Sequence, residues 1–137
     1  MTKNNLFLIF VFVMIGLLAF SSSAYAVLYE EISAFELKQR LSNNNDNGYI
    51  ILDIRPKTSY DLGHIPRAVN IPLDNLGYRY FELDKAKDII IYCDLGIKSK
   101  IACQILINAG FKDVYNLTGG LQEWTYALET SNGSVNI

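Results

Sequence analysis

The chain is poor in the residue types that bind transition metals or relay protons in hydrolases. Its 137 residues include only two cysteines and one histidine, His64. A single histidine cannot complete a cysteine and histidine cluster with the spacing of a zinc site. We therefore expect no metal, no other cofactor and no Ser-His-Asp chemistry. Two cysteines are also too few to build a disulfide framework for a domain of this size.

An excess of charge of one sign is also missing. The chain has 12 basic and 14 acidic residues, interspersed after residue 30, which give a net charge of -2. No basic stripe is present, so we expect no nucleic-acid binding. With only three prolines, half of the residues hydrophobic and 19% charged, the composition is that of one compact domain with a short appendage.

The appendage is the only long hydrophobic run, which covers residues 6–20. Lys3 precedes it, and three serines and the small residues of the triplet 24–26 follow it. A basic start, an apolar centre and a small-x-small end are the signature of a secretory signal peptide. We predict a signal peptide over residues 1–26, cleavage before Val27 and a domain over residues 27–137.

An uncleaved membrane anchor is the alternative for the same segment. No charge occurs between Lys3 and Glu30, and roughly 20 apolar residues can span a bilayer. The three serines make a full span less favourable, so the signal peptide is preferred. Under both alternatives Lys3 stays inside and the domain is exported, to the periplasm or another extracytoplasmic space. Contact with the membrane is expected only if the segment is uncleaved.

The rest of the chain alternates between helical and strand patterns. Ser33 and Glu36 form a capping box, and Ile32 and Leu37 a hydrophobic staple, which predict a helix to about Leu41. The polar run after it predicts a loop. Strands covered on both faces are predicted by apolar runs without alternation at 49–52, 68–71, 88–92 and 113–117.

Two further segments have a helical pattern. One places Ile101, Ile105 and Leu106 on one face and ends at Gly110. The other, 121–128, is amphipathic and contains Trp124. Strands alternating with helices predict an α/β domain with a central parallel sheet and helices on both faces. Ligands of such folds bind beyond the carboxyl ends of the strands, which directs attention to the residues after Tyr92.

Cys93 follows that strand and precedes a helix. A helix N-terminus offers unpaired amides and a positive dipole end, and both favour a thiolate. Gly96 can adopt a positive φ and let the loop curl, so that successive amides point inward and bind an anion. We therefore predict a nucleophilic sulfur on Cys93. The anion cradle is predicted from the residues that follow it: Asp94, Leu95, Gly96, Ile97, Lys98 and Ser99.

These residues make the chain resemble the rhodanese-like family, whose active loop combines a cysteine, a central glycine, a basic residue and a serine. Further motifs of the resemblance are 51–55, 63–72, 110–111 and 117–120, with Trp124 after them. The resemblance implies a parallel sheet flanked by helices and a thiolate that accepts sulfane sulfur as a persulfide. The implied donor is thiosulfate or a persulfide, and the implied acceptor is cyanide or a thiol.

The sequence departs from the family pattern at three positions. Ser59 stands directly before Tyr60, where many members of the family have an acidic residue, and this removes one partner for Arg55. Lys98 replaces a frequent arginine, so charge is kept without the planar fork. Asp94 adds a negative charge beside the thiolate.

Two alternative functions are suggested by the same loop. Phosphatases of related fold need arginine six positions after the cysteine to grip phosphoryl oxygens, and here that residue is Ser99. A non-catalytic persulfide carrier that serves a partner protein is compatible with the same motif and stays open.

The remaining candidates are assigned structural roles. His64 is expected to form hydrogen bonds within its turn, and Asp53 and Arg55 to organise loops. Trp124 is expected to pack in the core or at its rim. Cys103, one turn into a helix, is expected to be buried and apolar and to form no disulfide with Cys93.

Overall fold

In the computed structural model, residues 28–43, 47–133 and 135–136 are described, and the predicted signal peptide, 1–26, lies outside them. Five strands form one sheet in the order β1-β5-β4-β2-β3, and every neighbouring pair is parallel. The strands are β1 (Glu30–Ile32), β2 (Tyr49–Asp53), β3 (Val69–Asn70), β4 (Asp88–Tyr92) and β5 (Val114–Leu117). The predicted parallel sheet is confirmed, although β1 was not predicted and β3 is shorter than its apolar run.

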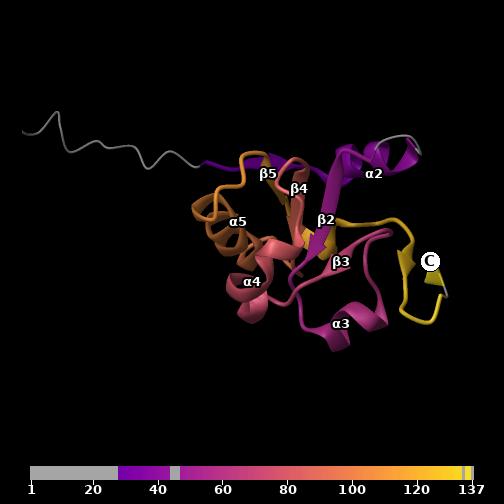
Figure 1. Ribbon diagram of the computed structural model, residues 1–137. Helices are drawn as coiled ribbons and strands as arrows, with labels where there is room; N and C mark the ends of the chain where they lie inside the picture. The colour runs from indigo at the N-terminus through magenta and orange to yellow at the C-terminus, as the bar shows by residue number, and fades with distance from the viewer. Residues whose placement is uncertain (1–27, 44–46, 134, 137) are drawn as a thin grey trace, which may run out of the picture.

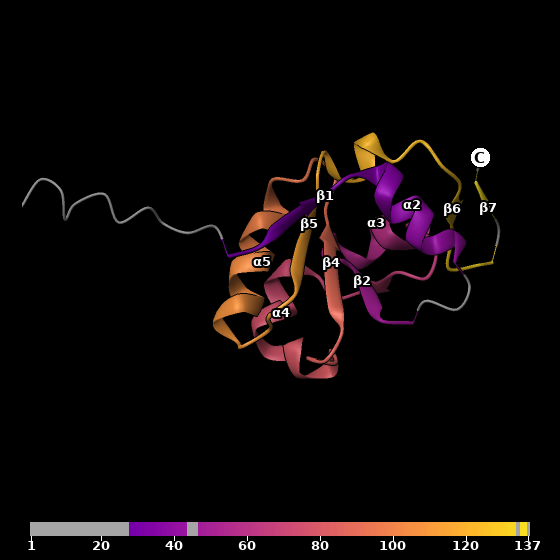
Figure 2. The same cartoon turned by 90° about the horizontal axis from the view of Figure 1, so that it is seen from above.

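Helices cover both faces of the sheet, as predicted (Figure 1; Figure 2). The α-helices are α2 (Ala34–Ser42), α3 (Lys57–Leu62), α4 (Leu73–Arg79) and α5 (Lys98–Asn108). Shorter elements are the 3₁₀ turns η1 (Tyr80–Glu82) and η2 (Gly120–Glu123) and a small antiparallel pair, β6 (Leu128–Glu129) with β7 (Val135–Asn136). Among the described residues, no helix has the length and apolar character needed to cross a membrane.

Alternate residues of β4 explain why its sequence shows no polar face. Ile89 and Ile91 pack in one core cluster with α4 and α5, while Ile90 and Tyr92 pack in the other with Leu37 of α2. A strand buried on both faces has no solvent side, so a continuous apolar run results. This central strand ends at the position from which Cys93 follows.

Local signals set the ends of two helices as predicted. The Ser33 hydroxyl accepts a hydrogen bond from the Glu36 amide, and the Ser33 amide donates to the Glu36 carboxylate. The two bonds complete the capping box at the start of α2. At the end of α5, Gly110 has φ +90°, and its amide donates to Ile107 while that of Phe111 donates to Leu106. This pair of bonds is a Schellman motif, which needs the left-handed conformation that glycine adopts easily.

The amphipathic segment after Leu121 is not the predicted helix. It begins with the single 3₁₀ turn η2 and continues without regular structure to β6. Two amides of that turn, from Leu121 and Gln122, donate to carbonyls of the neighbouring loop. The Trp124 side chain is buried in the core cluster beside α2, as its predicted packing role requires.

Candidate active site

Cys93 lies at the carboxyl end of the central strand with 4% of its surface exposed. Its Sγ is 3.4 Å from the Ser99 hydroxyl. Burial raises the pKa of the thiol, but hydrogen bonds from the Ser99 hydroxyl and from the amides of Ser99, Leu95 and Gly96 outweigh it, so the pKa is below that of an ordinary cysteine. Three amides of the predicted cradle, those of Leu95, Gly96 and Ser99, therefore act on the sulfur, and the net effect favours the thiolate.

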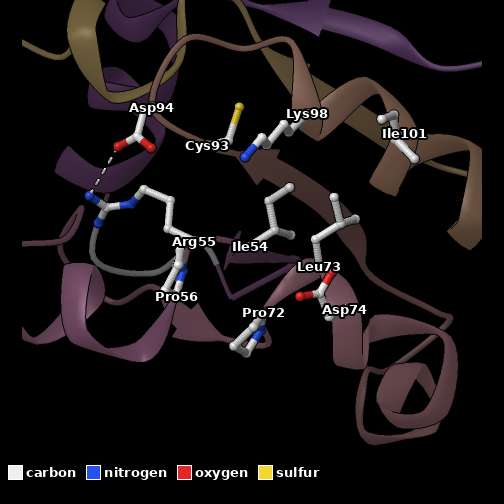
Figure 3. Close-up of a pocket in the computed structure, with 10 residues that line it drawn as sticks. All are labelled: Ile54, Arg55, Pro56, Pro72, Leu73, Asp74, Cys93, Asp94, Lys98 and Ile101. Carbon is white, nitrogen blue, oxygen red and sulfur yellow. Dashed lines mark ion pairs between the residues drawn. The ribbon is translucent and has the colours of Figure 1, made fainter.

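The other loop residues take different positions around this cradle. Gly96 is buried with φ +74°, which confirms the predicted positive φ. Leu95 and Ile97 expose 53% and 67% of their surfaces. Asp94 and Lys98 are also exposed, and their charged groups lie on opposite sides of Cys93 (Figure 3).

The loop is held from outside by β5 and the turn that follows it. The amide of Leu121 donates to the Cys93 carbonyl at 2.8 Å, and that of Gln122 to the Asp94 carbonyl at 3.0 Å. The Asn116 side chain donates to the Gly96 carbonyl at 3.3 Å. These contacts orient the loop carbonyls away from the sulfur, which leaves its amides free to face inward.

Gly120 makes this close approach sterically feasible. A Cβ at this position would lie 2.4 Å from the Cys93 carbonyl oxygen and 2.6 Å from the Gly96 nitrogen, and φ is +60°. Any side chain would push the loop away. No role was predicted for Gly119 and Gly120, although a glycine pair is a signal for close approach of two backbones.

A buried polar network lies behind the loop, at the end of β2. Arg55 donates to both carboxylate oxygens of Asp53, at 2.7 Å for its closest contact, and to the Gly63 carbonyl at 2.7 Å. The Tyr92 hydroxyl donates to Asp53 at 2.6 Å and accepts from the Ile65 amide at 3.1 Å. Asp53 and Arg55 therefore hold the segments at Gly63 and Ile65, in agreement with their predicted role in organising loops.

Arg55 also reaches the cysteine loop. Its Nη1 is 3.6 Å from Oδ1 of Asp94, whose side chain is 71% exposed. Burial lowers the pKa of Arg55, but the hydrogen bond and charge of Asp53 raise it by more. The net pKa is above the ordinary value, so the guanidinium stays charged. Although Ser59 cannot supply the acidic partner, Asp53 and Asp94 both pair with Arg55.

A cavity of about 300 Å³ opens beside Cys93, which we call the mouth cavity. Its lining comes from the ends of β2 and β4, the start of α4 and the first turns of α5 (Figure 3). The residues are Ile54, Arg55, Pro56, Pro72, Leu73, Asp74, Cys93, Asp94, Lys98 and Ile101. The cavity places an activated sulfur next to apolar side chains and to charges of both signs.

The other candidates have structural surroundings. Nδ1 of His64 lies 2.8 Å from the Tyr60 carbonyl, and its ring stacks on Tyr60 with 3.7 Å between centroids. Cys103 is fully buried, and it and Cys93 are both free thiols. Within the described parts of the chain, no three His, Cys, Asp or Glu side chains are grouped so that they could hold a metal ion.

Comparisons with known proteins agree with this geometry. Residues 33–127 match the family model of the rhodanese-like domain. Thiosulfate sulfurtransferase GlpE of Coxiella burnetii is 32% identical over 110 residues, which are 80% of this chain and 100% of that protein. The putative sulfur carrier protein YrkF of Bacillus subtilis is 36% identical over 108 residues, 79% of this chain and 57% of that protein.

A solved structure has the same fold. The crystal structure of a rhodanese-like domain protein from Staphylococcus aureus superimposes with a TM-score of 0.68 at 28% identity, and covers 74% of this chain and 98% of that one. The similarity therefore extends beyond the cysteine loop to most of the chain.

Proposed function

The chain belongs to the rhodanese-like family of sulfurtransferases and sulfur carriers, and on that premise we propose that it transfers sulfane sulfur through a persulfide on Cys93. The observation that carries the proposal is the Cys93 sulfur, whose pKa is lowered by the Ser99 hydroxyl and by three loop amides despite burial. The thiolate is the nucleophilic form of cysteine. No histidine is required for its activation.

In the first half of the reaction, the Cys93 thiolate attacks the outer sulfur of thiosulfate or the sulfane sulfur of a persulfide. A bond forms between Sγ and that sulfur, and the donor S–S bond breaks, with its electron pair leaving on sulfite or on the donor thiolate. The amides of Leu95, Gly96 and Ser99 then face the negative charge of the new persulfide. Lys98 supplies a positive charge at the edge of the mouth cavity.

In the second half, an acceptor thiolate or cyanide attacks the outer sulfur of the persulfide. The bond to Sγ breaks, its electron pair returns to Cys93, and the product is an acceptor persulfide or thiocyanate. Sulfur passes through with no external oxidant or reductant, so the cycle needs no cofactor.

Intact mass spectrometry tests this proposal directly. After incubation with thiosulfate and removal of excess donor, the protein is expected to gain the mass of one sulfur atom, and cyanide should remove it with release of thiocyanate. Cys93→Ser should gain nothing, because an alkoxide cannot hold a persulfide, while Cys103→Ser should behave as the native chain. Sulfur uptake by Cys93→Ser would contradict the assignment.

A persulfide carrier that serves a partner protein is the second candidate. It is favoured by the similarity to a putative sulfur carrier and by the acidic side chains Asp74 and Asp94 at the mouth cavity, which oppose a dianion. Steady-state assays separate the two. Many thiocyanate molecules formed for each Cys93 indicate an enzyme, and a single sulfur held and released indicates a carrier.

We also propose that the domain is exported after cleavage between Ala26 and Val27. The support is the order of the N-terminal sequence: Lys3, then the apolar run 6–20, then a small-x-small triplet. A mature protein beginning at Val27 outside the cytoplasm is the expected result. Full-length chain in the membrane fraction would instead establish the uncleaved anchor.

A further inference from the structure

The surroundings of Cys93 expose more apolar surface than a small inorganic substrate could use. Leu95, Ile97 and Ile101 expose between 53% and 67% of their surfaces, and all three belong to the loop or to the first turn of α5. Exposed apolar side chains grouped beside a reactive centre mark a surface for another molecule. Side chains of this length add nothing to the binding of thiosulfate or cyanide, which have no apolar part.

This surface has two hollows that share the sulfur. The mouth cavity includes Ile54, Leu73 and Ile101 (Figure 3). A second hollow of about 290 Å³, the loop hollow, is lined by Cys93, Asp94, Leu95, Ile97 and Lys98. Because Cys93, Asp94 and Lys98 line both, the contact surface continues from one side of the loop to the other, which is wider than a small anion.

The charges at this surface favour a basic partner. Asp74 and Asp94 are exposed at the mouth cavity. Of the two cations there, Arg55 is 6% exposed and is engaged by both carboxylate oxygens of the buried Asp53, which leaves Lys98 to face an incoming molecule. Arg55 also lies 3.6 Å from Asp94 and partly offsets its charge. The carboxylates of Asp53, Asp74 and Asp94 still exceed the cations Arg55 and Lys98 by one charge, which attracts a lysine or arginine more than a dianion.

We propose that the physiological acceptor of the Cys93 persulfide is a cysteine of a partner protein, set in an apolar surface that carries a basic side chain. The inference rests on the proposed persulfide and adds the class of acceptor. Apolar partner residues would cover Leu95, Ile97 and Ile101, and the basic group would pair with Asp74 or Asp94.

Transfer to this partner conserves atoms and electrons. The partner thiolate attacks the outer persulfide sulfur, a new S–S bond forms on the partner, and the bond to Cys93 Sγ breaks with its electron pair returning to Cys93. The partner leaves as a persulfide and Cys93 returns as a thiolate.

Synthetic peptides with one cysteine test the recognition chemistry. The first has leucine and lysine around the cysteine, the second replaces leucine by serine, and the third replaces lysine by glutamate. With Cys93 persulfide prepared from thiosulfate, transfer is followed by mass spectrometry, with glutathione and cyanide as small acceptors. The first peptide is expected to react roughly tenfold faster than each of the others and than glutathione.

Variants locate the contact on the protein. Ile101→Ser should lower the ratio of the peptide rate to the cyanide rate about fivefold, whereas Phe81→Ser, at a residue 74% exposed that lines neither hollow, should keep that ratio. Asp74→Lys should reverse the preference between the lysine and glutamate peptides. The comparison among peptides uses the native chain, so it does not depend on the folding of any variant.

The outcomes separate this inference from the proposed function. A persulfide that forms on Cys93 but reaches all peptides and glutathione at equal rates overturns the protein acceptor and leaves sulfur transfer intact. If no persulfide forms on the native chain, both proposals are wrong. Selective transfer that is unchanged in Ile101→Ser and Asp74→Lys also overturns the proposed surface.

Discussion

The two cysteines of this chain lie in neighbouring parts of one core cluster, yet their chemistry differs. Cys93 precedes α5 and its pKa is lowered, because the amides of the loop and the Ser99 hydroxyl offset burial. Cys103 lies inside α5, where burial and then the Glu31 carboxylate raise its pKa to about 12. Inside a helix the backbone amides are already used by the helix itself, whereas the first amides of a helix have no internal partner.

The comparison shows that burial alone does not decide the reactivity of a thiol. Cys93 is 4% exposed and Cys103 is fully buried. Both therefore lose hydration, which disfavours the thiolate. What separates them is the supply of hydrogen-bond donors that have no other acceptor, and this supply depends on where each residue stands relative to the start of α5.

Alkylation should show the largest difference between the two thiols. At pH 7, iodoacetamide is expected to modify Cys93 more than about a thousandfold faster than Cys103, because rates follow the thiolate fraction and access. For Cys93 the rate should already rise with pH below the ordinary thiol range, since a lowered pKa leaves thiolate present at lower pH. Peptide mapping at several pH values measures both rates, and equal rates would contradict the assigned environments.

Adding a methyl group at Gly120 should displace the loop whose amides lower the pKa of Cys93. Its Cβ would lie 2.4 Å from the Cys93 carbonyl oxygen at φ +60°, so Gly120→Ala should destabilise the fold by about 2 kcal/mol or more. Sulfur transfer should be lost as the loop moves.

Gly77→Ala is the matched control, because nothing lies within 4 Å of a Cβ there. Gly77 is inside α4, so alanine should raise stability by about 0.5–1 kcal/mol. Urea unfolding of both variants, read with the transfer assay, measures the contrast. A Gly120→Ala variant as stable and active as the native chain would show that this contact does not hold the loop.

Ser99 should make a smaller contribution. Ser99→Ala removes the hydroxyl 3.4 Å from Sγ, so the pKa of Cys93 should rise and the kcat/KM for thiosulfate at pH 6 should fall about fivefold, equivalent to about 1 kcal/mol. Because the Cys93 pKa is expected to rise, the loss of kcat/KM should disappear at high pH, where the thiol is ionised with or without the hydroxyl. A deficit of constant size at every pH would indicate a packing role instead.

The smallest effect is expected from the charge of Asp94. Its carboxylate is 71% exposed and lies 3.6 Å from Arg55, which offsets part of its repulsion of a dianion. Asp94→Asn should raise kcat/KM for thiosulfate about two- to threefold at low salt and less at high salt. Alkylation of Cys93 by neutral iodoacetamide should change little. Equal acceleration of both reactions would mean that Asp94 acts on the thiol rather than on the donor.

Local patterns were enough to predict the elements around the site. The run 88–92, without a polar face, predicted a strand covered on both sides, and the capping box at Ser33 and the glycine at 110 marked helix ends that the structure shows. Each of these signals involves only a few neighbouring residues, so it can be identified from the sequence. Cys93 could be singled out for the same reason, because it stands between a predicted strand and a predicted helix.

Contacts between distant segments could not be predicted in that way. The segment 121–128 has a helical pattern, but only the 3₁₀ turn η2 forms there, and the amides of Leu121 and Gln122 donate to the carbonyls of Cys93 and Asp94. Arg55 was left without its expected partner by Ser59, yet the fold brings Asp53 and Asp94 to it. Such pairings depend on the order of strands in the sheet.

The sequence by itself determined the α/β class, the strand that carries Cys93 and the glycine that lets its loop curl, because hydrophobic period, capping residues and backbone freedom are properties of neighbouring residues. Only the tertiary structure decided which distant groups hold the Cys93 loop and which charges face its sulfur. The parallel order β5-β4-β2 brings the turn at Gly120 and the network of Asp53 and Arg55 to opposite sides of one loop, and hydrogen bonds and charges act through space rather than along the chain.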